Sequence, residues 1–154
     1  MEEFRVPTTP VEAEIQLLDG RMLRGTVFVP ASASVHSGPE RMDEWINEGA
    51  PFFAFRPEGT QGADLLGKRS VVRLSVPAAS ARDEDATRGV ERCRVVIECP
   101  GGRFEGDIRL DMPDHLRRVL DYINQPGAFI SLYVGATVHL IQKSLVIRII
   151  QKAG

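Results

Sequence analysis

The sequence of 154 residues is poor in the residue types that mark specialised classes of protein. It has only two cysteines, one tryptophan and three lysines, and its 19 basic residues nearly balance 21 acidic ones. A formal charge of −2 gives no electrostatic reason to expect nucleic acid or an anionic membrane as partner. Because the remaining basic residues are all arginine, the composition favours a bacterial source with a GC-rich genome.

Long apolar runs are also missing. No stretch approaches the roughly 18 residues that a membrane-spanning helix needs, and the acidic start, Met1–Arg5, has no apolar core typical of a secretion signal. We therefore expect a cytoplasmic protein without a membrane partner.

The cysteines and histidines form no pattern typical of a metal or catalytic site. Cys93 and Cys99 fall in one predicted strand, about 20 Å apart, so they cannot pair, and we expect both to be small buried hydrophobic residues. His36, His115 and His139 accompany no nucleophile motif, phosphate loop or acidic cluster. These observations predict no metal, no cofactor and no enzymatic activity.

The chain contains an internal repeat. Residues Arg41–Asn47 match Arg118–Asn124 without a gap, as Arg-x-x-acid-aromatic-Ile-Asn, and both copies have phenylalanine five positions later. Upstream, a Gly-x-x-x-x-Gly pattern occurs before each copy, at Gly20 and Gly101, and downstream Arg69–Val71 stands where Lys143–Leu145 does. The sequence therefore predicts two β-β-α-β-β units, residues 9–77 and 92–152, joined by a surface linker over residues 78–91.

Strands are predicted from period-two alternation and apolar runs bounded by turn residues. The predicted strands are Val11–Leu17, Met22–Val29, Phe52–Arg56, Ser70–Val76, Cys93–Cys99, Arg103–Leu110, Phe129–Val134, Thr137–Ile141 and Leu145–Gln151. Asp19-Gly20 and Pro100-Gly101-Gly102 are typical of tight hairpin turns.

One short helix is predicted in each unit. In the second unit Asp114 suits an N-cap, followed by an apolar stripe of Leu116, Val119, Leu120 and Ile123. In the first unit, Ser37 with Glu40 resembles a capping box ahead of an apolar face made of Met42, Trp45 and Ile46. Gly49 and Gly127 are expected as left-handed C-terminal caps.

The expected fold is mainly β with short helices (β-rich α+β), forming small bent sheets or SH3/Sm-like barrels. The doubled motif resembles a family of uncharacterised small β-barrel-like bacterial proteins that carry an Arg-Leu-Ser-Asp-x-Leu-Asn-like motif once. That resemblance implies the fold unit and no activity. The hairpin Leu18–Gly25 is more weakly similar to Sm-like barrels, but a helix stands where their RNA-contacting strand would lie.

A further likeness concerns cyclic-dinucleotide binding. Arg88–Arg92 fits the Arg-x-x-x-Arg pattern of PilZ domains, whereas Asp111–Leu116 lacks the Ser and Gly of their second motif. We therefore place a Sm-like RNA-binding or cyclic-dinucleotide-binding protein second, as the alternative function.

The repeated polar and aromatic residues are the candidate partner-binding residues: Arg41, Trp45, Asn47, Arg118, Tyr122 and Asn124. Their structural interpretation is an arginine–acid pair at i and i+3 with an asparagine that closes the helix. Their functional interpretation is a surface that binds another protein, since arginine beside an aromatic residue suits an interface hot spot.

The last predicted strand bears on partners as well. Leu145–Ile150 is apolar on both faces, so an edge position would require cover from the first unit or from a second chain. We thus expect a non-enzymatic protein-interaction or adaptor module that binds another protein, with a homodimer through the C-terminal hairpin as a further possibility and nucleic acid as an unexpected partner.

Overall fold

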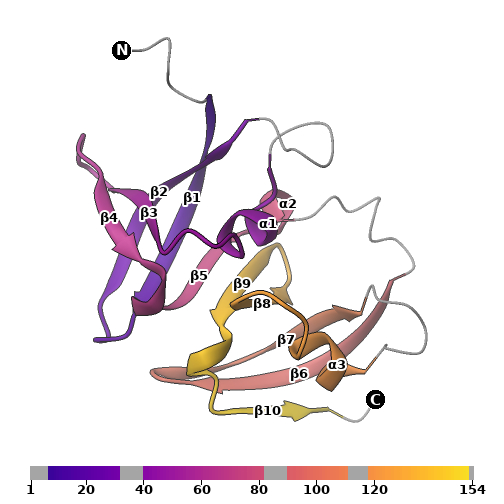
Figure 1. Ribbon diagram of the computed structural model, residues 1–154. Coiled ribbons are helices and arrows are strands. Elements are labelled where there is room, and N and C mark those ends of the chain that lie inside the picture. Colours follow the sequence, from indigo (N-terminus) through magenta and orange to yellow (C-terminus); the bar gives the residue numbers. More distant parts are fainter. Residues whose placement is uncertain (1–6, 32–39, 82–89, 111–117, 153–154) are drawn as a thin grey trace.

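A computed structural model describes residues 7–31, 40–81, 90–110 and 118–152, which form a mainly β structure with short helices (Figure 1). One open antiparallel sheet has the strand order β10-β6-β7-β8-β9-β5-β1-β2-β3-β4. The strands are β1 (Thr8–Leu17), β2 (Met22–Pro30), β3 (Phe52–Pro57), β4 (Asp64–Gly67), β5 (Val71–Pro77), β6 (Glu91–Cys99), β7 (Gly102–Leu110), β8 (Phe129–Val134), β9 (Thr137–Gln142) and β10 (Arg148–Gln151). The helices are α1 (Met42–Ile46), α2 (Ala78–Ala81) and α3 (Val119–Ile123), with 3-10 turns η2 (Lys68–Ser70) and η5 (Lys143–Leu145).

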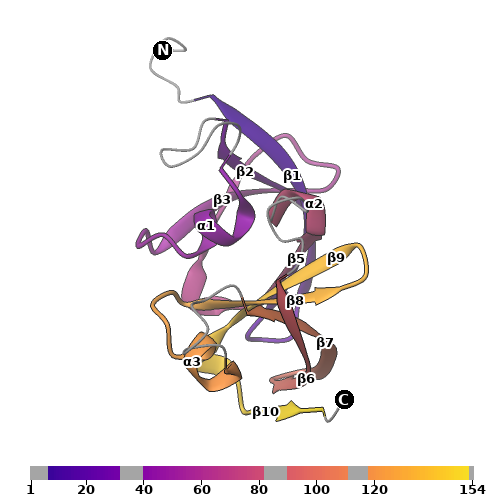
Figure 2. The same ribbon diagram turned by 90° about the vertical axis from the view of Figure 1, so that its right-hand side faces the viewer.

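We call residues 7–81 the first half and residues 90–152 the second half. The halves meet where β5 pairs with β9 over Arg73–Pro77 and Thr137–Ile141. This junction makes the sheet continuous, so the first and second halves are not separate sheets. Both views show the two halves stacked on either side of β5 and β9 (Figures 1 and 2).

The two opening hairpins have the expected glycine-based turns. Gly20 and Gly101 adopt φ angles of +92° and +85°, in the left-handed region that favours glycine. Two further glycines, Gly25 in β2 and Gly106 in β7, lie against the neighbouring strand. A Cβ atom at Gly25 would stand 2.0 Å from the Arg56 carbonyl oxygen, and one at Gly106 would stand 2.6 Å from that of Tyr133. Both positions therefore need glycine for close strand approach.

Most predicted strands are present, but two predictions need correction. Strand β4 is missing from the sequence-based prediction because it has only four residues, largely exposed and without an apolar alternation. The predicted order β-β-α-β-β is therefore wrong, since each half has three strands after α1 or α3. The predicted strand Leu145–Gln151 is shortened to Arg148–Gln151, since Lys143–Leu145 forms the 3-10 turn η5.

Helix α1 begins later than predicted. Its N-cap is Arg41, whose backbone N–H donates to the Glu44 carboxylate at 3.1 Å. The predicted cap at Ser37 is outside the described residues. Glu40 precedes the N-cap, and its N–H donates to the carbonyl of Pro30, at the end of β2.

Helix α3 is similarly short, with Arg118 as its N-cap. The predicted cap Asp114 and the first stripe residue Leu116 lie outside the described residues, and Leu120 is exposed instead of buried. The C-caps are Asn47 and Asn124, both with negative φ, so the glycine caps predicted at Gly49 and Gly127 are wrong. Gly127 does have a positive φ, but it stands three residues beyond the cap.

The segment predicted as a surface linker, residues 78–91, begins with α2. Ala81 at the end of α2 is fully buried, against the first hydrophobic core. Residues 82–89 lie outside the described part, and β6 begins at Glu91, at the end of the predicted linker.

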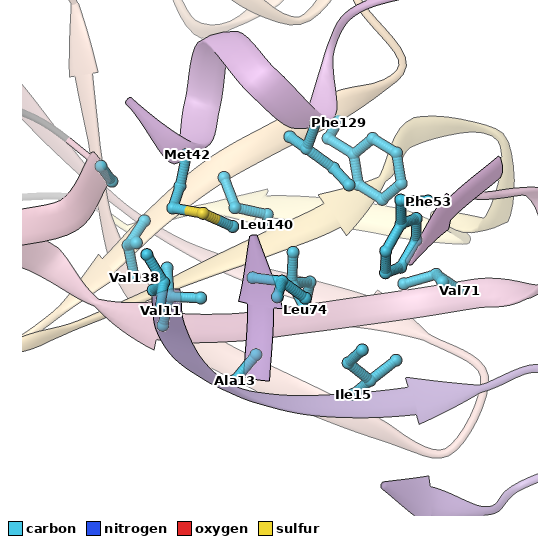
Figure 3. Close-up of a cluster of buried hydrophobic side chains, with 14 of the residues drawn as sticks. Val11, Ala13, Ile15, Met42, Phe53, Val71, Leu74, Phe129, Val138 and Leu140 are labelled. Carbon is cyan, nitrogen blue, oxygen red and sulfur yellow. The ribbon is translucent and has the colours of Figure 1, made fainter. Parts of the chain in front are cut away.

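Two hydrophobic cores lie on the sheet, and each takes residues from both halves. The first core is built on β1, β2, β3, β5 and α1, but also contains Phe129, Val138 and Leu140 of the second half (Figure 3). The second core is built on β6 to β9 and also contains Val72 of β5. The halves therefore depend on each other for burial of apolar surface.

Candidate functional site

A polar cluster lies on the sheet where the two halves meet. Ser75 of β5 and His139 of β9 are directly opposite each other, and the Ser75 Oγ lies 2.6 Å from His139 Nδ1. The Arg73 guanidinium donates to the same Ser75 oxygen at 2.5 Å. The Ser75 oxygen accepts from Arg73, and its contact with His139 is a second hydrogen bond whose direction follows from the tautomer of the imidazole.

Burial keeps His139 neutral. Desolvation, followed by the nearby positive charge of Arg73, lowers the pKa of His139 to about 4, with a small opposing effect of Glu14. At neutral pH the imidazole of His139 therefore carries no charge.

Arg73 is a charged residue with only 7% of its surface exposed. Its guanidinium lies 3.7 Å from the Glu14 carboxylate and 4.7 Å from the centre of the Phe104 ring, which belongs to the second half. Its Nε donates to Gln16 Oε1 at 3.4 Å, and the Gln16 amide donates to the Pro100 carbonyl at 2.8 Å. A buried charge is tolerated only when such partners replace water. The cluster therefore joins the halves by polar contacts that run from β1 through β5 to β9 and the β6–β7 turn.

Arg73, Ser75 and His139 line an open groove of about 690 Å³, to which β1, β2 and the end of β3 also contribute residues. Three arginines and three glutamates line it: Arg24, Arg56, Arg73, Glu12, Glu14 and Glu58. Arg24 is already paired with Glu14 at 3.2 Å. The groove thus has no excess of positive charge that would attract a phosphate-rich ligand.

The 2.6 Å between Ser75 Oγ and His139 Nδ1 is the spacing of a nucleophile and its base. Ser75 is nevertheless buried, and its oxygen already accepts from the Arg73 guanidinium, which lowers its capacity to attack a substrate. Among the described residues, no group of three or more His, Cys, Asp or Glu side chains could hold a metal ion. The geometry is best explained as a structural polar connection between β5 and β9.

Two amides make a second set of contacts between the halves. The Gln142 side chain donates to the carbonyls of Lys68, Arg69 and Val71, at distances of 2.8 to 3.2 Å. Asn47 donates to the Asp43 carbonyl at 2.8 Å and accepts from the Phe129 backbone N–H at 2.9 Å. Asn47, a predicted partner-binding residue, therefore closes α1 and binds the start of β8.

The other predicted site residues of the first copy also have structural contacts. Trp45 packs edge-on against Phe53, with ring centres 5.3 Å apart, and covers the first core. Arg41 is the N-cap already described, so its position is set by the start of α1.

In the second copy, Arg118 makes the predicted pair with Asp121, through bonds of 2.8 and 3.2 Å. The Tyr122 hydroxyl accepts from the Ser131 N–H at 3.3 Å, while Asn124 caps α3 on an exposed surface. Both views place α1 and α3 apart, with β8 and β9 between them (Figures 1 and 2). The six predicted residues are therefore not brought together into one surface.

Arg73, Ser75 and His139 are the residues that sequence reasoning did not bring together. In the sequence, His139 accompanies no motif that would assign it a partner. A signal did exist: Arg73 and Ser75 interrupt an otherwise apolar strand whose residues from Val71 to Val76 are all buried. A polar residue within such a run needs a buried partner.

The two outer edges of the sheet carry exposed apolar side chains. On the β3–β4 edge, Phe52 and Leu65 are 60% and 73% exposed, and Ile147, just before β10, is 72% exposed. Leu65 and Ile147 are the two most exposed large hydrophobic residues in the described part of the chain. An uncovered edge strand offers unpaired backbone groups to another strand.

In comparisons with known proteins, no family model, no curated protein and no solved structure matches this chain. Within the described residues, no helix has the length and apolar character needed to cross a membrane.

Proposed function

We propose that the chain consists of two copies of one unit, each with five strands and a helix between its second and third strands. The strand order β5-β1-β2-β3-β4 of the first half corresponds to β10-β6-β7-β8-β9 of the second. The helices α1 and α3 have equal length, and a 3-10 turn precedes the last strand of each half.

Individual contacts support the same correspondence. Lys68 Nζ donates to the Glu48 carbonyl at 2.9 Å, and Lys143 Nζ donates to the Gln125 carbonyl at 2.6 Å. Each acceptor immediately follows the asparagine that caps the helix. These bonds pair Lys143 with Lys68, one residue earlier than the Arg69 of the sequence alignment.

We further propose that the protein is a non-enzymatic, cytoplasmic protein-interaction module that binds its partner through the edges of the sheet. The observation that carries this proposal is the exposure of Leu65 and Ile147 at the two edges. Strand addition to an exposed edge combines backbone hydrogen bonds with pockets for alternate side chains. The resemblance to uncharacterised small β-barrel-like bacterial proteins is compatible with this function and names no other.

The test is capture of partners from a native lysate by the tagged chain, with and without nuclease. The bait is compared with the double variant Leu65→Lys, Ile147→Lys, and with Thr8→Lys, which adds a charge to an exposed strand position away from both edges. We expect a specific protein that survives nuclease, is retained by Thr8→Lys and is lost from the double variant. RNA or DNA that disappears with nuclease would instead support the Sm-like or nucleotide-binding alternative.

A further inference from the structure

The junction between the halves provides a template for a second interface. It pairs the last strand of the first unit, β5, with the fourth strand of the second unit, β9. If the two units correspond as proposed, the matching strands are β10 and β4. These are the two strands at the ends of the sheet.

Corresponding residues differ in burial at the β4 edge. Phe52 of β3 corresponds to Phe129 of β8. On the strands that pair with them, β4 and β9, Leu65 corresponds to Leu140. Phe129 and Leu140 are 4% and 0% exposed in the first core, where the neighbouring unit covers them. Their counterparts are 60% and 73% exposed. The β4 edge thus carries the same apolar side chains without a neighbouring unit.

The β10 edge shows the same difference. Ile147 corresponds to Val72, two residues after the 3-10 turn in each unit. Val72 is fully buried in the core of the other half, whereas Ile147 is 72% exposed. The helix caps differ as well: Asn47 is half-buried and bound to β8, and Asn124 is exposed. Two features that the first unit uses to hold the second, the apolar residue Val72 and the helix cap Asn47, therefore have uncovered counterparts on the second unit.

We propose that the partner at these edges is a second copy of this chain, with β10 of one copy pairing antiparallel to β4 of the next. This inference rests on the proposed function and names its partner. The internal register predicts Arg148 opposite Leu66, Ile149 opposite Leu65 and Ile150 opposite Asp64. In that register Arg148 also lies diagonal to Asp64 on the same face, which places opposite charges within reach.

The contact is heterologous, because each copy contributes a different edge. A pair of copies therefore still has one free β10 and one free β4, so that assembly continues until a ring closes or a filament forms. An isologous dimer, in which like edges meet, would have no such continuation.

Complementation between edge variants distinguishes these arrangements. Leu65→Lys disables the β4 side and Ile147→Lys the β10 side; both residues are exposed, so the fold of a single chain is maintained. Light scattering coupled to size-exclusion chromatography should show wild-type assemblies that grow with concentration, and each variant alone should self-associate at least about tenfold more weakly. An equimolar mixture of the two variants should form a heterodimer, since it contains one intact β10 and one intact β4 that can pair.

Thr8→Lys is the matched control and should assemble as the wild type does. Far-UV circular dichroism and Trp45 fluorescence verify the fold, and Phe52→Lys provides a second variant of the β4 side. Wild-type chain that stays monomeric at all concentrations, or variants that dimerise alone and do not complement, would overturn the second-copy proposal. Capture of a different protein that depends on the edges would then still support the proposed function. If the edges mediate neither self-association nor capture of another protein, the proposed function is overturned as well.

Discussion

At the scale of single residues, Asn47 and Asn124 occupy the same position at the ends of α1 and α3 but have different neighbours. Both have backbone angles near φ −85° and ψ 0°. Only Asn47 also accepts from the Phe129 N–H and so connects the halves. The same residue type therefore has a local role in both copies and a tertiary role in one.

We expect Asn47→Ala to lower the free energy of unfolding by about 1–3 kcal/mol, because it leaves the half-buried Phe129 N–H without its acceptor. Asn124→Ala should change it by less than about 0.5 kcal/mol. Urea unfolding in an Ile147→Lys background checks this without a contribution from assembly. Equal effects of the two substitutions would contradict the tertiary role of Asn47.

His139 is the residue whose titration most affects the junction. Its pKa of about 4 in the folded protein lies below the ordinary value of 6.5. Between these two pH values the unfolded chain binds a proton that the folded chain does not, so the free energy of unfolding falls as pH falls from 6.5 toward 4. Below about pH 4 both states are protonated and this contribution no longer changes.

We expect His139→Gln to make the free energy of unfolding less dependent on pH in this window. The slope should fall by up to about 1.4 kcal/mol per pH unit, which corresponds to the binding of one proton on unfolding. Urea unfolding of wild type and variant at several pH values between 4 and 7 measures the difference. Parallel profiles would mean that His139 does not titrate as inferred from its burial beside Arg73.

At the scale of elements, the short helices and tightly paired strands are held by packing more than by local propensity. Helices of five residues are unstable alone, and α1 is held by the burial of Met42 and Ile46 in the first core. The β2–β3 and β7–β8 pairs depend instead on close approach at Gly25 and Gly106.

We expect Gly25→Ala to destabilise the protein by about 3 kcal/mol, because the new methyl group would overlap the Arg56 carbonyl and push β3 away from β2. Gly106→Ala should cost less, since its clash is milder. Gly62→Ala is the control, because a Cβ atom there meets nothing within 4 Å. Thermal unfolding of the three variants gives the order; a neutral Gly25→Ala would contradict it.

At the scale of the whole molecule, the two cores make the halves one cooperative structure. Leu140 of the second half is fully buried in the first core, and Val72 of the first half is buried in the second. Loss of either half would expose apolar residues of the other. Single cooperative unfolding of the described halves follows from this exchange.

We expect Leu140→Ala to cost about 2–5 kcal/mol and to shift unfolding followed by Trp45 fluorescence, although Trp45 lies in the other half. Leu65→Ala, at the corresponding exposed position, should leave the transition within about 0.5 kcal/mol when both substitutions are made in the Ile147→Lys background, which removes the contribution of assembly. Circular dichroism should report the same midpoint as fluorescence. Separate transitions would contradict a shared core.

The sequence by itself determined the elements whose signal is local. Period-two alternation predicted β1 and β2, glycine turns predicted the hairpins at Gly20 and Gly101, and the doubled motif located α1 and α3. Each of these depends on neighbours a few residues away, which a sequence displays directly. The starts of the helices were less predictable. The backbone N–H of Glu40 bonds to the carbonyl of Pro30 in β2, a contact that the residues around Glu40 do not indicate.

Only the tertiary structure decided what depends on distant residues. Strand β4 has little pattern of its own and forms because β3 offers a pairing edge. Ser75 and His139, 64 positions apart, meet because β5 pairs with β9. The same junction buries Leu140 and leaves Leu65 exposed. Because both residues are leucine, the residue type does not show which of them is buried. Burial depends on which edge meets another strand, and this pairing is set by contacts between halves and not by the local chain.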